Sequence, residues 1–189
     1  VSVVLARDEA GTVRVFPTGE NRHRNGILDI TIAPARASVC LHEGTHTSAH
    51  EIAERIAEKL GYVGTLGVEF FVCRGELFVN EMAPRPHNSG HHTIDACDAS
   101  QYDQQVRALC GLPLAVPRQH SAAVMVNLLG ELWYDGGHAN GAYREPDWAA
   151  LHAVPGLHLH LYGKHHARPG RKMGHFTVTG DDVAPVLAR

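Results

Sequence analysis

The chain has 189 residues, enough for one sizeable core or for one domain with a small appendage. Hydrophobic residues make up 44% and charged residues 20%, an ordinary globular composition, and no apolar run is long enough to span a membrane. The formal net charge of -3 does not favour nucleic-acid binding, and four cysteines without a C-x-x-C pair argue against a zinc or redox motif. Reduced thiols in a cytoplasmic protein are the simplest interpretation.

The N-terminal part of the chain predicts strands and one helix. Residues 1–7 and 13–17 form a predicted hairpin, and 21–35 hold a loop and a further strand. A helix is expected over 46–61, because apolar residues recur every fourth position and a glycine follows where a C-terminal cap belongs. The chain begins directly as a strand and without a methionine, which predicts a piece of a longer polypeptide or one chain of a split protein.

The remaining signals are mostly those of antiparallel hairpins. A helix over 100–110 is predicted by Ser100 as its cap and Asp103 three residues later. The order of elements indicates an α+β fold with an internal boundary between residues 118 and 119. The other predicted elements are strands at 65–73, 77–83, 122–130, 157–162 and 176–180, a short helix at 147–152, a basic loop at 163–175 and a terminal helix from Asp181.

The predicted hairpin of residues 65–83 places two glutamates opposite each other. A three-residue turn centred on Gly75 sets a register in which Glu69 faces Glu81. Two carboxylates on neighbouring strands repel each other, and an unpaired charge in an apolar strand is costly. Magnesium, which binds oxygen ligands and completes its shell with water and substrate phosphates, would relieve both problems. The alternative is a slip of one residue that turns one glutamate toward solvent.

Histidine is the compositional outlier, with 15 residues. In HEGTHTSAH, residues 42–50, three histidines recur at every fourth position and could share one helical face, but the stretch contains no H-E-x-x-H motif. A polar start of the following helix is the simpler interpretation. A histidine-rich metal-binding protein therefore stays open as a hypothesis that rests on composition alone.

A resemblance to a known family enters at the same hairpin. Residues 67–97, GVEFFVCRGELFVNEMAPRPHNSGHHTIDAC, closely resemble the metal-site hairpin and following loop of the 5-(carboxyamino)imidazole ribonucleotide synthase family. The resemblance covers nearly the whole chain and implies the second half of an ATP-grasp domain, an antiparallel sheet with packed helices, followed by a small β-rich C-terminal domain. Further stretches similar to the family are NRHRNGILDITIAPA (21–35), SQYDQQVRALCGLPL (100–114) and LHLYGKHHARPGRKMGH (159–175).

The resemblance implies an ATP-dependent ligase of purine biosynthesis. In that reaction ATP and bicarbonate form carboxyphosphate, and the amine of aminoimidazole ribonucleotide then attacks its carboxy carbon. The family's first domain and its glycine-rich phosphate loop have no counterpart in these residues. We therefore expect the chain to be inactive alone, and to form a homodimer or to associate with an N-terminal half. The alternative is a non-catalytic half that binds a ligand or a partner.

Residue by residue, the resemblance implies a magnesium-ATP site. Glu69 and Glu81 match the two magnesium ligands of the family. Asn80 together with Glu81 matches a pair that contacts the nucleotide, and His23 matches a further nucleotide contact. Many ATP-grasp enzymes carry an asparagine ligand where this chain has Ala83, so the metal shell must rely more on phosphates and water.

Two groups of candidate residues would bind the other substrates. Arg85 matches an arginine that grips bicarbonate or carboxyphosphate, and His87 and Asn88 stand where donors to the same anion are expected. No aromatic side chains interleave with the cations of the basic loop, which disfavours nucleic-acid binding. The resemblance instead implies that the loop binds the 5′-phosphate of the ribonucleotide through Lys164 and Arg171, with Arg168 as a further candidate.

Overall fold

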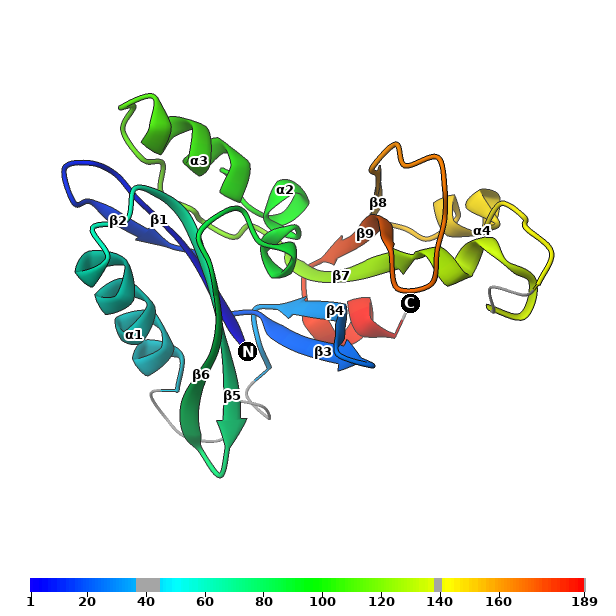
Figure 1. The fold of residues 1–189 in the computed structure, drawn as a ribbon, viewed down its shortest axis with the longest axis horizontal. Helices are drawn as coiled ribbons and strands as arrows, with labels where there is room; N and C mark the ends of the chain where they lie inside the picture. Colours follow the sequence, from blue (N-terminus) through cyan, green and yellow to red (C-terminus); the bar gives the residue numbers. More distant parts are fainter. Residues whose placement is uncertain (37–44, 138–140, 189) are drawn as a thin grey trace.

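The computed structural model describes residues 1–36, 45–137 and 141–188, and side chains from 48 onward in the second of these ranges (Figure 1). Two antiparallel sheets with a few helices form an α+β fold, as predicted. The first sheet has the strand order β2 (Val13–Val15), β1 (Ser2–Arg7), β5 (Gly64–Cys73) and β6 (Glu76–Ala83). The second has the order β3 (Glu20–Arg24), β4 (Ile27–Ala33), β7 (Ala122–Leu129), β9 (Lys172–Gly180) and β8 (Leu157–Leu161).

Helices cover both faces of the first sheet, and β1 is therefore almost wholly buried (Figure 1). The helix α1 (Thr45–Lys59) packs alanines at every fourth position against one face, where their small side chains allow a close approach. The helix α3 (Gln101–Leu109) packs against the other face. The core on the α1 side contains Val3, Leu5, Ala49, Ala53, Ala57, Leu66, Val68 and Phe70.

The second sheet mixes strands from the two ends of the chain. The hairpin β3–β4 pairs with β7 rather than with β1, so residues 20–33 belong to the same sheet as the C-terminal strands. A terminal helix, α5 (Val183–Leu187), packs on this sheet. Sheet membership thus does not follow the order of the chain, and the boundary at 118/119 stays a prediction.

Most of the predicted elements are confirmed, with shifts of a few residues at their ends. Ser100 and Asp103 form the expected capping box of α3, and α4 (Trp148–His152) begins after Asp147. The strand β9 begins at Lys172, four residues earlier than predicted. The strand expected within residues 21–35 is β4, whereas the loop expected before it is the strand β3. Other elements that were not predicted are the 3-10 helices η1 (Asn88–Gly90), η2 (Gly130–Trp133) and η3 (Asp135–Gly137), and α2 (Thr93–Ala96).

The β5–β6 hairpin has the predicted glutamate pair but not the predicted turn. The turn has two residues, Arg74 and Gly75, both with positive φ, which is the type I′ arrangement. The register next to the turn is therefore one residue away from the prediction. A bulge restores it further along the strands, where Asn80 is the extra residue and Glu69 again lies opposite Glu81.

None of the helices within the described ranges combines the length and the apolar character needed to cross a membrane.

Candidate functional site

A cleft of about 440 Å³ lies between the two sheets. It is lined from four sides: the β3–β4 hairpin, the β5–β6 hairpin, the loop of residues 84–90, called here the anion loop, and the basic loop with the start of β9. The lining residues are His23, Gly26, Ile27, Leu28, Glu69, Glu81, Arg85, His87, Asn88, Lys164, Gly170 and Lys172.

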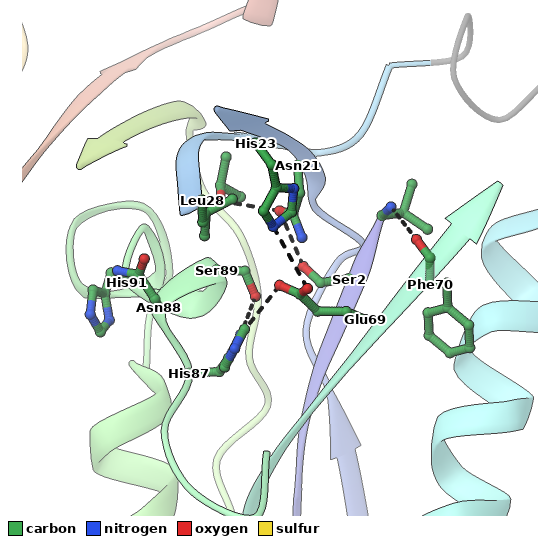
Figure 2. A network of polar contacts seen from close by, with 12 residues as sticks. Ser2, Asn21, His23, Leu28, Glu69, Phe70, His87, Asn88, Ser89 and His91 are labelled. Atoms are coloured by element: carbon green, nitrogen blue, oxygen red, sulfur yellow. Dashed lines mark hydrogen bonds and ion pairs between the residues drawn. The ribbon is translucent and has the colours of Figure 1, made fainter. Parts of the chain in front are cut away.

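Glu69 is the buried acid of this cleft, with only 9% of its side chain exposed (Figure 2). Its two carboxylate oxygens face two imidazoles, with His23 Nε2 at 3.8 Å from Oε2 and His87 Nδ1 at 3.9 Å from Oε1. Burial raises the pKa of Glu69, and the negative charge of Glu81 raises it as well, while a positive charge on His23 would act in the opposite direction. A cation between the two carboxylates would relieve both effects, so the donor set fits a divalent metal ion.

His87 is held in place by contacts to its backbone. The buried Gln101 of α3 accepts from the His87 amide at 2.8 Å and donates to the His87 carbonyl at 2.8 Å. Gly67 on β5 permits this approach, because a Cβ there would lie 2.7 Å from His87 Cβ. Burial, followed by the charge of Arg85, lowers the pKa of His87 to about 4. At neutral pH the ring is therefore uncharged, and Nδ1 lies 2.8 Å from Ser89 Oγ.

Three cationic side chains line the cleft, those of Arg85, Lys164 and Lys172, and no role was predicted for Lys172 from the sequence. Arg85 is exposed and donates to the carbonyl of Pro86 at 3.1 Å. Lys164 donates to the carbonyl of Lys172 and lies 5.4 Å from the ring centroid of Tyr162. Lys172 is partly buried; burial lowers its pKa, and the negative charge of Glu69 opposes that change. The position of Lys172 places a cation beside the glutamate pair.

Neither Arg168 nor Arg171 is among the described residues that line the cleft. Arg171 donates through Nη1 to the carbonyl of His166 at 2.7 Å, so its side chain turns back along the basic loop. Lys172 opens β9 and is thereby directed differently from Arg171. Because Arg171 and Lys172 are both cationic, residue type alone could not show which of them lines the cleft. That depends on where β9 begins, which was predicted four residues too late from the sequence.

Asn88 reaches the cleft wall with its side chain already engaged. Its Nδ2 donates to Asn127 Oδ1 at 3.0 Å, and its Oδ1 accepts from Asn127 Nδ2 at 2.6 Å. The side chain is thus part of a reciprocal amide pair between the anion loop and β7, as well as a wall of the cleft.

The two remaining candidates for nucleotide contact meet in an adjoining cleft of about 220 Å³. His23 and Asn80 both line it, together with Phe71 on the same strand as Glu69. His23 and Glu69 line both clefts, so the two clefts share a wall. Ala83, by contrast, is buried opposite Gly67 and contributes no ligand atom.

A second cluster brings together Asp95, His160 and His175, whose potential ligand atoms lie within 4.8 Å of one another. His160 Nε2 lies 2.9 Å from Asp95 Oδ2, which is an ordinary ion-pair contact between α2 and β8. The rings of His160 and His175 are stacked at 18°. Two nearly parallel rings cannot direct their lone pairs at one ion, so this cluster fits a brace better than a metal centre. Most of the histidine tract 42–50 lies outside the described side chains.

Two family models match different parts of the chain. A family model described as ATP-grasp domain matches residues 1–102, and one described as phosphoribosylaminoimidazole carboxylase C-terminal domain matches residues 123–189. The chain therefore belongs to the ATP-grasp family.

The similar proteins include several N5-carboxyaminoimidazole ribonucleotide synthases. The chain is 42% identical to the one from Bacillus subtilis (strain 168) and 45% identical to the one from Brucella melitensis biotype 1, over 94% of its own length in each case. It spans only 43% and 45% of the lengths of these relatives.

Solved structures agree with these matches. The synthetase from Thermus thermophilus superposes with a TM-score of 0.85 at 41% identity, covering 100% of this chain and 48% of that one. The synthase from Aspergillus clavatus, solved in complex with ADP and 5-aminoimidazole ribonucleotide, superposes with a TM-score of 0.85 at 30% identity, over 99% of this chain and 48% of that one.

Proposed function

We propose that these residues supply the magnesium, anion and ribonucleotide-phosphate parts of the active site of an N5-carboxyaminoimidazole ribonucleotide synthase. In this reaction ATP, bicarbonate and 5-aminoimidazole ribonucleotide yield the carboxyamino product, ADP and phosphate. The observation that carries the proposal is the pairing of Glu69 with Glu81 in a cleft that also contains Arg85, His87 and Lys172.

The glutamate pair would hold magnesium, and the adjoining cleft would hold ATP. Glu69 and Glu81 offer hard oxygen ligands from a rigid sheet, and magnesium between them would neutralise charge that develops on the β- and γ-phosphates. His23 and Asn80 would contact the nucleotide, since both line the adjoining cleft. The structures of relatives in complex with ADP support this assignment.

Arg85 and Lys172, which line the cleft from two sides, would hold bicarbonate and then carboxyphosphate. Arg85 can bind a carboxylate or a phosphate with two parallel hydrogen bonds, and Lys172 adds a second positive charge. His87, with a pKa of about 4, would act as a neutral hydrogen-bonding group. Asn88 would complete this wall, with a second amide hydrogen beyond the one that it donates to Asn127.

The basic loop would receive the 5′-phosphate of 5-aminoimidazole ribonucleotide. Lys164 lines the cleft, and we assign the phosphate to it together with Arg171, with Arg168 as a further candidate. A cytoplasmic location fits the three described cysteines, all of them free thiols. Exposed apolar residues on β5 and β6 support association with the remainder of an ATP-grasp domain or with a second copy.

The test replaces the metal ligands one at a time. In a polypeptide that completes the ATP-grasp domain, Glu69→Gln and Glu81→Gln should each lower carboxylation by roughly a hundredfold or more, because metal binding supplies several kcal/mol of charge stabilisation. Excess magnesium should recover part of the loss. The matched control is Glu58→Gln, at an exposed position of α1.

Turnover of both variants equal to that of the control would remove the glutamate pair from the mechanism. If the unaltered polypeptide itself gives no carboxylated product, the alternative of a non-catalytic binding module stands instead.

A further inference from the structure

A single asparagine of the second sheet contacts two walls of the cleft at once. Asn127 lies on β7 and is 3% exposed. Its Nδ2 donates to the carbonyl of Leu28 at 2.8 Å and to Asn88 Oδ1 at 2.6 Å, and its Oδ1 accepts from Asn88 Nδ2 at 3.0 Å. Leu28 and Asn88 both line the cleft, one from β4 and the other from the anion loop.

The orientation of this amide pair is determined by its neighbours. The carbonyl of Leu28 can only accept, so the Asn127 atom that faces it must be the nitrogen. The Asn127 oxygen then faces Asn88, which must present its own nitrogen there. The same two hydrogens of Asn127 Nδ2 therefore serve both walls, and neither amide can flip without losing hydrogen bonds in a buried place.

The anion loop is thus held at two successive residues from two different directions. Gln101 on α3 grips both backbone polar groups of His87. Asn127 on β7 grips the side chain of Asn88. With only one of these contacts, the loop could pivot about it. Both contacts together fix the distance from Arg85 and His87 to Glu69.

We propose that Asn127 is a positioning residue for the anion loop, an inference that rests on the function proposed above. It touches no substrate; it holds Asn88, and through it Arg85 and His87, where a bound anion meets the γ-phosphate. A displacement of about 1 Å at such a site can cost roughly a hundredfold in rate, because the reacting atoms must already be aligned. Carboxyphosphate that forms out of alignment would be lost to water instead of reaching the amine.

The test compares Asn127→Ala and Asn127→Asp with a matched buried amide elsewhere. Asn127→Asp keeps the volume but removes both donated hydrogen bonds. The control is Gln104→Ala: Gln104 is also fully buried, and it donates to the Ala115 carbonyl at 2.7 Å and accepts from the Ala115 amide at 3.0 Å, outside the lining of the cleft. All variants are made in the polypeptide that completes the ATP-grasp domain.

We expect all three variants to lower the melting temperature and only the Asn127 variants to change the chemistry. Their kcat/KM for bicarbonate should fall roughly tenfold or more, and more ADP should form per carboxylated product. Because Asn127 acts through Asn88, the double variant with Asn88→Ala should be no worse than the worse single variant. Activity and coupling equal to those of Gln104→Ala would overturn the proposal.

Hydrogen exchange gives a readout that does not depend on the reaction. The Gly90 and His91 amides donate to the carbonyls of His87 and Asn88 at 3.0 and 3.2 Å, and they should exchange faster in the Asn127 variants than in the control. If the unaltered polypeptide makes no carboxylated product, the proposed function fails while this measurement still decides the positioning role. If both Asn127 variants unfold, Asn88→Ala removes the same pair from the other side, and unchanged protection and coupling there would contradict the inference.

Discussion

At the level of single residues, Lys172 is the cation that offsets the negative charge of Glu69 and Glu81 in the cleft. It lies beside two glutamates, of which one is buried, and its neighbour in sequence, Arg171, faces away. A partly buried ammonium in such a place stabilises negative charge more strongly than an exposed one, because less water screens it. Under the proposed function, the charge of Lys172 would be available to an anionic substrate once magnesium neutralises the glutamates.

We therefore expect Lys172→Met, in the completed polypeptide, to lower kcat/KM for the anionic substrates by roughly tenfold to a hundredfold, the equivalent of one charge-assisted contact of about 1.5–3 kcal/mol. Steady-state kinetics with bicarbonate and ribonucleotide varied separately would show which of them depends on Lys172. The matched control is Lys59→Met, at the exposed end of α1. Equal kinetics of the two variants would exclude Lys172 from the site.

At the level of elements, two hairpins use the same turn with different residues. The β3–β4 turn is Asn25–Gly26, with φ of 52° and 75°, and the β5–β6 turn is Arg74–Gly75, with φ of 52° and 84°. Asparagine tolerates the left-handed region and arginine does not, so Arg74 is strained where Asn25 is not. The hairpin that carries both glutamates thus has the less favourable turn.

The two turns allow a reciprocal test of stability. Arg74→Asn should raise the free energy of unfolding by about 0.5–1 kcal/mol, and Asn25→Arg should lower it by a similar amount. Urea unfolding followed by circular dichroism measures both on one scale. Changes of the same sign in the two variants would show that turn conformation does not control the stability of these hairpins.

Across the whole molecule, buried neutral histidines should make stability depend on pH. Burial lowers the pKa of His87, His92 and His175 to about 4 and that of His91 to about 3. Below pH 6.5 these histidines are protonated in the unfolded chain but remain neutral in the folded chain. The free energy of unfolding therefore falls as pH drops from about 6.5 toward 4. The raised pKa of Glu69 acts in the opposite direction at the acidic end of this window.

His92 alone should account for a loss on the order of 1 to 2 kcal/mol between pH 6.5 and 5, because burial lowers its pKa to about 4. Gln can still donate to the Ser89 carbonyl, which lies 3.0 Å from His92 Nδ1, but it cannot ionise. His92→Gln should therefore flatten the dependence of unfolding free energy on pH, while His120→Gln, at an exposed position, should leave it unchanged. Identical slopes for both variants would contradict this assignment.

A polypeptide of only these 189 residues should show no bicarbonate-dependent ATPase activity. The glutamate pair and Arg85 would not align the nucleophile with the triphosphate when no glycine-rich loop covers it, and the sequence contains none. Phe71, Phe78, Val79 and Met82 leave an apolar face on β5 and β6, with exposed fractions of 61, 50, 47 and 48%. Adding the separately expressed remainder of the ATP-grasp domain should restore turnover, and turnover without it would refute this expectation.

The sequence by itself determined the elements whose signals are local. Ser100 and Asp103 capped α3 as expected, because a capping box depends only on residues three apart. The pairing of Glu69 with Glu81 was also correct, although the turn assumed for it was wrong. The predicted turn was one residue too long, and the bulge at Asn80 was not foreseen. These two errors cancelled each other, which is why the predicted pairing of the two glutamates was nevertheless correct.

Only the tertiary structure decided which residues face the cleft. The β3–β4 hairpin joined the second sheet, Lys172 rather than Arg171 or Arg168 reached the cleft wall, and Asn127 paired with Asn88 across 39 positions of the chain. Side-chain direction depends on where a strand begins and on which sheet it joins, and both are set by burial summed over distant segments. No pattern within a short window contains that information, because the partners that decide it lie far away in the sequence.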